Sequence, residues 1–241
     1  MKEKIFIPSR AGFPISAFVS RDEKLKQQKL AIIAGGYGSH KETPNQKARA
    51  AFFENMGYAT LVFDRYGIGE TGGDFLDTHP TRNLKDMDDI RSFVVALNWV
   101  KKDEIVLFGN SYGGLLSYIE AARCPLYRKL ILSAPALAYK DTLNGPHMQA
   151  WRLQKVMHIM GIDRHIHFYD DMLNYDLDAM AAQIRCPVLI IHGTQDKKVP
   201  FKRSEEIAGK LKDATLVPLQ GQGHSYDFNL AVKPMADFLN K

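Results

Sequence analysis

The sequence predicts an α/β fold built around a mostly parallel sheet of eight strands with helices on both faces. Short runs rich in β-branched residues alternate with amphipathic segments along most of the 241 residues, which is typical of βαβ units. Several runs, such as 31–33 and 189–191, are apolar at every position, as expected for parallel strands that helices bury on both faces.

The elements follow one another in a regular order. The first two strands, 5–8 and 15–19, are separated by a turn at residues 10–14, which favours an antiparallel hairpin. Later strands are expected at 30–34, 60–64, 104–108, 129–133, 188–192 and 215–219. Helices are expected at 46–55, 83–101, 202–212 and 228–240, with a further one beginning near Tyr112. In segment 83–101 the apolar residues recur every three or four positions, which predicts one buried stripe.

One long segment breaks this alternation. Between Ala134 and Ile184 there is no convincing buried strand, and the segment is too long for an ordinary connection. We therefore expect a core of residues 1–134 and 184–241 and a small, mostly helical inserted cap of residues 135–183. The aromatic and methionine content of the cap suits a lid over an apolar acyl or aryl group, and equally the plain packing of a helical subdomain.

Composition and charge argue against several classes of protein. Hydrophobic residues make up 45% and charged residues 24% of the chain, the profile of a globular protein. The 32 basic residues are interspersed with 27 acidic ones for a net charge of +5, so we expect no nucleic-acid partner. Cys124 and Cys186 are too few for a disulfide scaffold. No signal-peptide region or bilayer-spanning stretch is recognisable, so the expected location is cytoplasmic.

The sharpest functional signal is the segment Gly109-Asn110-Ser111-Tyr112-Gly113, which ends a predicted strand and begins a predicted helix. A G-x-S-x-G pattern in this context predicts a nucleophilic serine at position 111. The tight turn exposes the hydroxyl, and side chains at positions 109 and 113 would collide with the neighbouring strand and helix. The helix that follows supplies free N–H groups and the positive end of its dipole.

A serine hydroxyl needs a base, and the base needs an acid to hold it. Asp196 follows the penultimate strand and His224 lies in a glycine-rich loop after the last strand, which is the chain order expected with this serine motif. Asp227 is an alternative acid, but it lies too close in sequence to His224 to orient it easily. His192, at a strand end, is expected to anchor the Asp196 loop rather than to act as the base.

Acyl transfer also needs donors for the developing oxyanion. We expect one to be the backbone N–H of Tyr112 and the other to be that of Tyr37, in the glycine-containing loop 34–40 after the third strand. The Gly35-Gly36 pair does not have the spacing of a dinucleotide-binding fingerprint.

Two further motifs are given structural interpretations. Residues 64–71 are expected to form a structured loop beside the site, because the G-K-[ST] ending of a phosphate-binding loop is missing. His165 and His167 could be two metal ligands, but no spacing around them matches a structural zinc site. We therefore expect no metal and no cofactor.

Together, the Ser111 elbow, the Asp196 loop and the Gly223-His224 loop resemble the α/β-hydrolase superfamily. Within it the chain is most similar to compact bacterial esterases of the cinnamoyl/feruloyl esterase and monoacylglycerol lipase-like group, which also have a loop like 64–69 and a short insertion before the acid-bearing strand. The resemblance implies the α/β-hydrolase fold, with nucleophile, acid and base at Ser111, Asp196 and His224.

The resemblance also implies oxyanion donors at Tyr37 and Tyr112. The chain departs from the family at Gly35-Gly36, where His-Gly is common, so we expect a different support for the oxyanion loop. The segment 111–114 is also similar to the prolyl oligopeptidase group, whose large N-terminal propeller we do not expect in a chain of this length.

The predicted function is that of a serine carboxylesterase that hydrolyses small to medium acyl or aryl esters through an acyl-enzyme. A thioesterase or peptidase with the same triad is an alternative, because the triad does not distinguish the leaving groups. A low-turnover ligand receptor on the same fold is a second alternative, although binding alone does not need an intact triad. Dehalogenase chemistry is disfavoured, since that reaction uses a carboxylate at the position of Ser111.

Overall fold

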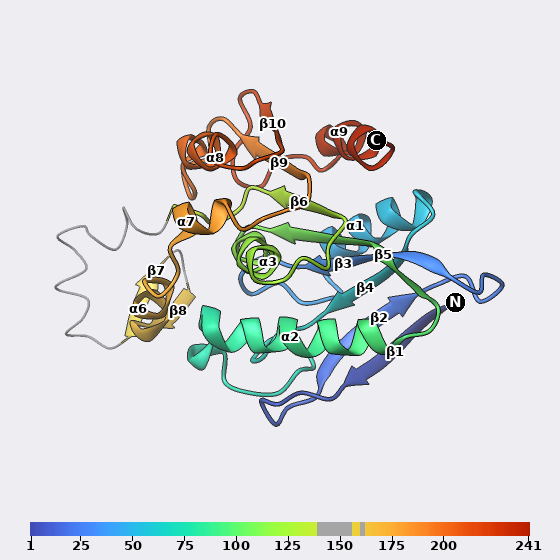
Figure 1. Cartoon of the computed structure of the whole chain (residues 1–241). Coiled ribbons are helices and arrows are strands. Elements are labelled where there is room, and N and C mark those ends of the chain that lie inside the picture. Colours follow the sequence, from blue (N-terminus) through green and yellow to red (C-terminus); the bar gives the residue numbers. More distant parts are fainter. Residues whose placement is uncertain (139–155, 160–161) are drawn as a thin grey trace.

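The computed structural model describes residues 1–138, 156–159 and 162–241 and has helices on both faces of a central sheet (Figure 1). The sheet order is β1-β2-β4-β3-β5-β6-β9-β10. The strands are β1 (Lys2–Ile7), β2 (Ile15–Ser20), β3 (Gln28–Ala34), β4 (Ala59–Phe63), β5 (Val100–Asn110), β6 (Lys129–Ser133), β9 (Val188–Gly193) and β10 (Ala214–Leu219). β2 is antiparallel to β1 and β4, and the remaining pairs are parallel, so the predicted hairpin and mostly parallel sheet are confirmed.

Two separate hydrophobic clusters mark the two faces of the sheet. On one face α1 (Pro44–Asn55) and α9 (Asn229–Leu239) contribute buried residues to the smaller cluster. The larger cluster lies on the other face of the sheet. Its buried residues come from α2 (Pro80–Ala96), α3 (Tyr112–Arg123), α8 (Phe201–Ala208) and the turn after α8. The apolar strands 31–33 and 189–191 send side chains into both clusters, which explains why they are apolar at every position.

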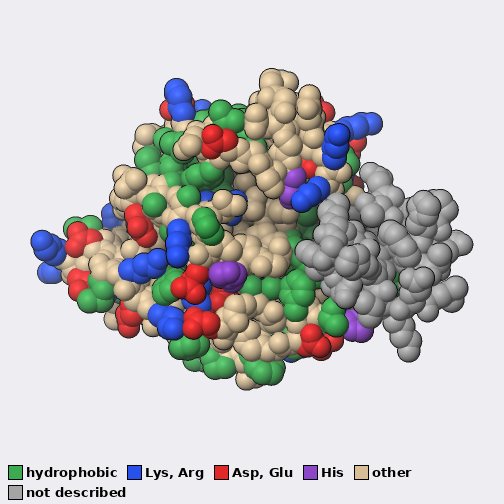
Figure 2. Space-filling view, turned by 180° about the vertical axis from the view of Figure 1, so that it is seen from behind, with side chains coloured by type: hydrophobic (Ala, Val, Ile, Leu, Met, Phe, Trp, Pro, Cys, Tyr) green, Lys and Arg blue, Asp and Glu red, His purple; other side chains and the backbone are tan. Residues whose placement is uncertain are grey.

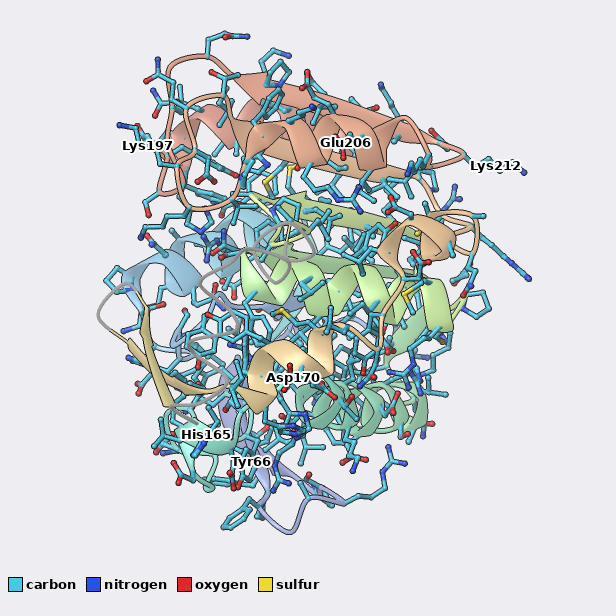
Figure 3. All side chains as sticks on the ribbon, turned by 90° about the vertical axis from the view of Figure 1, so that its left-hand side faces the viewer. Tyr66, His165, Asp170, Lys197, Glu206 and Lys212 are labelled. Atoms are coloured by element: carbon cyan, nitrogen blue, oxygen red, sulfur yellow. The ribbon has the colours of Figure 1, made fainter. Side chains whose placement is uncertain are left out.

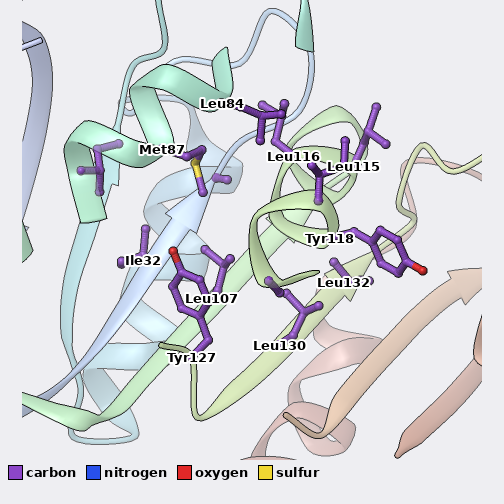
Figure 4. Packing of buried hydrophobic residues seen from close by; sticks show 14 of the residues in the cluster. Ile32, Leu84, Met87, Leu107, Leu115, Leu116, Tyr118, Tyr127, Leu130 and Leu132 are labelled. Carbon is purple, nitrogen blue, oxygen red and sulfur yellow. The ribbon is translucent and has the colours of Figure 1, made fainter. Parts of the chain in front are cut away.

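Helix α3 packs on the sheet beside α2 (Figure 4). Leu115 and Leu116 of α3 are fully buried, and they pack with Leu84 and Met87 of α2 over Leu107 of β5. Burial of a leucine side chain stabilises a fold by about 1.5–3 kcal/mol. This packing therefore fixes the start of α3, which is where the predicted nucleophile lies.

The helix expected at 83–101 ends earlier than predicted. α2 stops at Ala96, and Val100 begins β5, where it pairs with Gln28 of β3. The ammonium of Lys102 donates hydrogen bonds to the carbonyls of Val94 and Leu97 at the end of the helix. Val100 is buried, as the predicted apolar helical stripe requires, but it is buried in a strand. Apolar spacing alone does not distinguish a buried helix position from a buried strand position.

The described part of the long insertion contains a hairpin that the sequence did not reveal. β7 (Val156–Ile159) pairs antiparallel with β8 (Ile162–His165), and the short helices α6 (His167–Met172) and α7 (Leu177–Ala181) follow. Figure 3 shows α6, which carries Asp170, beside α2 and the hairpin that ends at His165. Four-residue strands are too short to give a clear alternation. Residues 139–155 and 160–161 of the expected cap lie outside the described residues.

Charged side chains of both signs are intermixed on the face shown in Figure 2. Within the described ranges no helix is long and apolar enough to cross a bilayer.

Candidate active site

Ser111 occupies the turn between the central strand β5 and helix α3. Its backbone has φ 52° and ψ −117°, a region that a residue with a Cβ adopts only at a cost of about 1–3 kcal/mol. The N–H of Ser111 donates to the carbonyl of Ser133 on β6 at 2.9 Å. Hydrogen bonding to the neighbouring strand and packing of α3 thus hold the serine in a strained turn.

The glycines on either side of Ser111 are required by close contacts. A Cβ at Gly109 would collide with the carbonyl oxygen of Gly113, and one at Gly113 would collide with the carbonyl oxygens of Ala34 and Gly35. These are the collisions with strand and helix that the sequence pattern predicts.

Ser111, His224 and Asp196 form a continuous chain of hydrogen bonds. Nε2 of His224 lies 2.9 Å from Oγ of Ser111, and Nδ1 of His224 lies 2.6 Å from Oδ2 of Asp196. The carboxylate is buried, whereas the imidazole is 15% exposed. A histidine held between a carboxylate and a hydroxyl can take the hydroxyl proton when the oxygen attacks an electrophile.

The Asp196 carboxylate is surrounded by donors. Oδ1 accepts from the N–H groups of Lys198 and Val199 at 2.8 and 2.9 Å, and Oδ2 accepts from both His192 and His224. Burial alone raises the pKa of Asp196, but the hydrogen bonds from His192, His224 and Val199 outweigh it and hold the pKa well below its ordinary value. The carboxylate therefore stays ionised opposite the imidazole.

The two residues that the sequence sets aside have other contacts. The carboxylate of Asp227, the alternative acid, accepts from the N–H of Asn229 at the start of α9. His192 is fully buried, with Nδ1 2.7 Å from Oγ of Ser204 and Nε2 2.9 Å from Oδ2 of Asp196. His192 therefore anchors the Asp196 loop, in agreement with the sequence-based interpretation.

The two expected oxyanion donors belong to segments that meet at Ser111. Tyr112 is the first residue of α3, where N–H groups have no partner within the helix. The loop after β3 passes close to the serine, since a Cβ on Gly36 would lie 3.5 Å from that of Ser111. The ring of Tyr37 contacts the ring of Tyr112, with centroids 5.5 Å apart.

Loop 64–71 is tied to the loop after β3 by a buried ion pair. Oδ1 of Asp64 accepts from the N–H of Lys41 at 2.6 Å, and Oδ2 lies 2.7 Å from the Lys41 ammonium. Glu70 binds the same ammonium at 2.5 Å. A Cβ on Gly69, whose φ is 56°, would collide with the Asp64 carboxylate. The sequence indicated a structured loop here but not these partners, and it also missed Arg65, whose guanidinium binds the same loop.

The insertion contacts the core close to the site. Asp171 of α6 accepts hydrogen bonds from the N–H and hydroxyl of Thr81, at 2.6 and 2.7 Å, and the Thr81 hydroxyl also meets that of Tyr175 at 2.7 Å. Phe168 of α6 packs on Tyr37, with ring centroids 5.2 Å apart. Aromatic side chains from the insertion thus adjoin the loop that passes Ser111.

The histidines considered as metal ligands lie in this same region. His167 stacks edge to face on His79, with ring centroids 4.5 Å apart. Among the residues that the structure describes, no group of three or more histidine, cysteine or acidic side chains is arranged to hold a metal ion.

A comparison with models of known protein families finds a match over most of the chain. The model of the prolyl oligopeptidase family matches residues 44–234. Over 260 aligned residues the chain is 24% identical to the palmitoyl-protein thioesterase ABHD10 of Mus musculus, covering 100% of this chain and 84% of the relative. It is 23% identical over 164 residues to the acylamino-acid-releasing enzyme of Homo sapiens, covering 65% of this chain but only 22% of that enzyme.

Solved structures agree on the fold. Est1E from Butyrivibrio proteoclasticus, determined with ferulic acid bound, superposes with a TM-score of 0.89 at 24% identity, covering 98% of each chain.

Proposed function

The chain belongs to the prolyl oligopeptidase family of α/β hydrolases, and from this premise we propose that it is a serine carboxylesterase acting on small to medium acyl or aryl esters. The observation that carries the proposal is the chain of hydrogen bonds from Ser111 through His224 to Asp196. The strained turn at Ser111 adds support, because such strain is retained where the surrounding structure enforces it, often at functional sites.

In the acylation step, Oγ of Ser111 attacks the ester carbonyl carbon while Nε2 of His224 takes the hydroxyl proton. Asp196 keeps the Nδ1–H of His224 oriented and stabilises the imidazolium. The N–H groups of Tyr37 and Tyr112 bind the oxyanion of the tetrahedral intermediate. The intermediate collapses, the alcohol leaves with the proton from Nε2, and the acyl group remains on Ser111.

In the deacylation step, a water molecule takes the place of the alcohol. His224 removes a proton from the water as its oxygen attacks the acyl carbon, and the second tetrahedral intermediate uses the same two N–H donors. Return of the proton to Oγ of Ser111 releases the acid. Every proton in this cycle moves through Nε2 of His224, so no metal or redox group is required.

We assign the cap to residues 135–183, of which the described helix α6 contacts the loop that carries Tyr37. Support comes from Phe168 of the insertion, which packs on both Tyr37 and Tyr112. An aromatic lining of this kind suits an apolar acyl or aryl group.

A thioesterase is the second candidate. Mouse ABHD10 is named a palmitoyl-protein thioesterase, and its similarity extends over the whole of this chain. A thioester passes through the same intermediates, so the site fits either leaving group. A peptidase and a low-turnover receptor remain further alternatives that the same kinetic experiment separates.

The experiment compares wild type, Ser111→Ala and the control Ser92→Ala, whose serine lies exposed on α2. Hydrolysis is measured with p-nitrophenyl esters from acetyl to long acyl chains, with an acyl-CoA and with an aryl amide. We expect the esters to be turned over fastest, with loss of at least about 10⁴-fold in Ser111→Ala and no change in Ser92→Ala. Faster acyl-CoA hydrolysis would favour the thioesterase, and full activity in Ser111→Ala would refute the mechanism.

Labelling with a fluorophosphonate completes the test. Labelling of Ser111 without multiple turnover of any substrate would indicate a receptor that keeps a competent nucleophile. Absence of labelling would remove the assignment of Ser111 as the nucleophile.

A further inference from the structure

Arg65 is a buried cation whose hydrogen bonds go to the backbone of the loop after β3. It is 1% exposed. Its Nη1 donates to the carbonyl of Gly35 at 2.6 Å and its Nη2 donates to the carbonyl of Gly36 at 2.8 Å. One planar guanidinium therefore holds two consecutive peptide groups through two nitrogens in a fixed plane, whereas a lysine at this position would offer one freely rotating ammonium.

The second of these peptide groups is the one that contains the N–H of Tyr37. In a trans peptide the C=O and the N–H point in opposite directions, and the chain has no cis peptide bond in its described part. The Gly36 carbonyl is fixed by Arg65 and by the N–H of Ser39 at 3.1 Å. The N–H of Tyr37 is thereby turned away from Arg65.

The other expected oxyanion donor is also in contact with Arg65. The guanidinium carbon lies 5.3 Å from the ring centroid of Tyr112, and the Tyr112 hydroxyl is fixed by a 2.9 Å hydrogen bond to Asn83. The cation thus binds the peptide group that contains the N–H of Tyr37 and contacts the ring of Tyr112.

Burial of Arg65 is costly, and the surroundings offset the cost only in part. Burial lowers the pKa of the guanidinium, while the Tyr112 hydroxyl and the carboxylates of Asp86 and Asp64 act in the opposite direction. Nε of Arg65 is buried without a hydrogen-bond partner among the described residues. A buried charge with an unsatisfied donor is expensive to keep for stability alone.

We propose that Arg65 is a positioning residue that presets the oxyanion hole by locking the Gly36–Tyr37 peptide and the Tyr112 ring. This inference rests on the proposed function. It also accounts for the Gly35-Gly36 departure from the His-Gly pattern, because the loop is held through its carbonyls. The Asp64–Lys41 pair fixes the far end of the same loop.

The variants are Arg65→Met and Arg65→Lys, with Lys129→Met as the matched control. Lys129 is also a buried cation that binds two consecutive backbone carbonyls, those of Phe238 and Leu239 at 2.8 and 3.0 Å, at the C-terminal end of α9. The control therefore loses the same kind of contact without touching the oxyanion loop.

Each protein is assayed for kcat and KM on the best p-nitrophenyl ester, for inhibition by a trifluoromethyl ketone, and for inhibition by the amide of the same acid. The ketone forms a tetrahedral oxyanion on the serine, whereas the amide is a ground-state analogue. For Arg65→Met we expect kcat to fall about 10²–10³-fold, the loss typical of one oxyanion donor. Ketone affinity should fall in parallel, while KM and amide affinity change less than about threefold. Arg65→Lys should recover part of kcat, and Lys129→Met should keep wild-type kcat.

Two results would overturn the proposal: wild-type kcat and ketone affinity in folded Arg65→Met, or equal losses of ketone and amide affinity. If Arg65→Met does not fold, Arg65→Lys decides by the same criteria. The rate of labelling by a fluorophosphonate separates this proposal from the esterase assignment, because phosphonylation uses the same hole but needs no natural substrate. Labelling that is slow in Arg65→Met and fast in wild type upholds the role of Arg65 even if no ester is hydrolysed, and equal rates refute it.

Discussion

Nε2 of His192 lies 2.9 Å from Oδ2 of Asp196, the carboxylate oxygen that also accepts from His224. The carbonyl of Val199 lies 3.2 Å from the same Nε2. Both neighbours of this nitrogen are acceptors, so Nε2 carries a proton and donates it, while Nδ1 lies 2.7 Å from the hydroxyl of Ser204. A fully buried histidine therefore stands behind the proposed catalytic acid.

Replacement His192→Asn should weaken the hold on Asp196. A hydrogen bond to a charged group contributes about 1.5–3 kcal/mol, so we expect a 10- to 100-fold drop in kcat/KM together with a lower melting temperature. Ser204→Ala removes only the partner of Nδ1 of His192. Its kcat/KM and its melting temperature should therefore fall less than those of His192→Asn. Unchanged ester hydrolysis in a folded His192→Asn protein would show that the three remaining donors, the N–H groups of Lys198 and Val199 and the imidazole of His224, suffice for Asp196.

The positive φ of Ser111 predicts an unusual effect of glycine. Ser111→Gly removes the Cβ that strains this conformation, whereas Ser111→Ala keeps it. Although glycine ordinarily destabilises a fold relative to alanine, we expect Ser111→Gly to be more stable than Ser111→Ala by about 1 kcal/mol. Urea denaturation of the two inactive variants measures this difference directly, and a lower stability of the glycine variant would contradict the strain at this turn.

Gly113→Ala should be far more damaging than a typical glycine replacement. The added methyl group would meet the carbonyl oxygens of Ala34 and Gly35, so α3 must move away from β3. We expect a loss of about 3 kcal/mol or more in the free energy of unfolding, together with loss of ester hydrolysis. Gly209→Ala is the matched control: φ is −68° and the nearest atoms to the new Cβ lie 3.6 Å away, so stability should change by less than about 1 kcal/mol.

Asp86 gives the protein a stability that depends on pH. Burial raises the pKa of this carboxyl to about 6, against the lowering effects of hydrogen bonds from Tyr66 and Asn83. In the unfolded chain the carboxyl titrates near its ordinary value of 3.8. Ionisation therefore costs the folded protein stability as the pH rises from about 4 through 6, and the penalty is complete above that range.

Asp86→Asn removes this penalty. We expect the variant to gain up to about 3 kcal/mol over wild type at pH 8 and little at pH 4, since two units of pKa correspond to that energy. Asp89→Asn is the control, because Asp89 accepts hydrogen bonds from the N–H and guanidinium of Arg10 and should lose stability at pH 8. Guanidinium unfolding curves between pH 4 and 8 test both, and a pH-independent difference between Asp86→Asn and wild type would refute the titration.

The sequence predicts best those features whose cause is local. A tight turn at Ser111 demands small residues two positions away on each side, so Gly109 and Gly113 carry the signal themselves. Asp196 and His224 each follow a predicted strand. Because the carboxyl ends of parallel strands share one edge of a sheet, their positions in the sequence were enough to predict that they lie near Ser111. The structure sets these side chains at hydrogen-bonding distances from one another.

Features that depend on distant partners were not predictable. Val100 fits a helical stripe as well as a strand, and its pairing with Gln28 decides between them. Arg65 binds the carbonyls of Gly35 and Gly36, thirty positions earlier in the chain, and a backbone carbonyl has no residue-specific signature. The raised pKa of Asp86 likewise arises from burial in the folded protein, which its sequence neighbours do not reveal.

Strands β6 and β9 are adjacent and parallel, with Leu130 opposite Val188. The chain therefore departs from the sheet after Ser133 and comes back to the very next strand, whatever lies between. An insertion between two neighbouring strands can be lengthened, shortened or exchanged without changing the pairing register of any strand in the sheet. Under the proposed function, exchanging this insertion with that of a relative is expected to change substrate selectivity while the strands that carry Ser111, Asp196 and His224 keep their register.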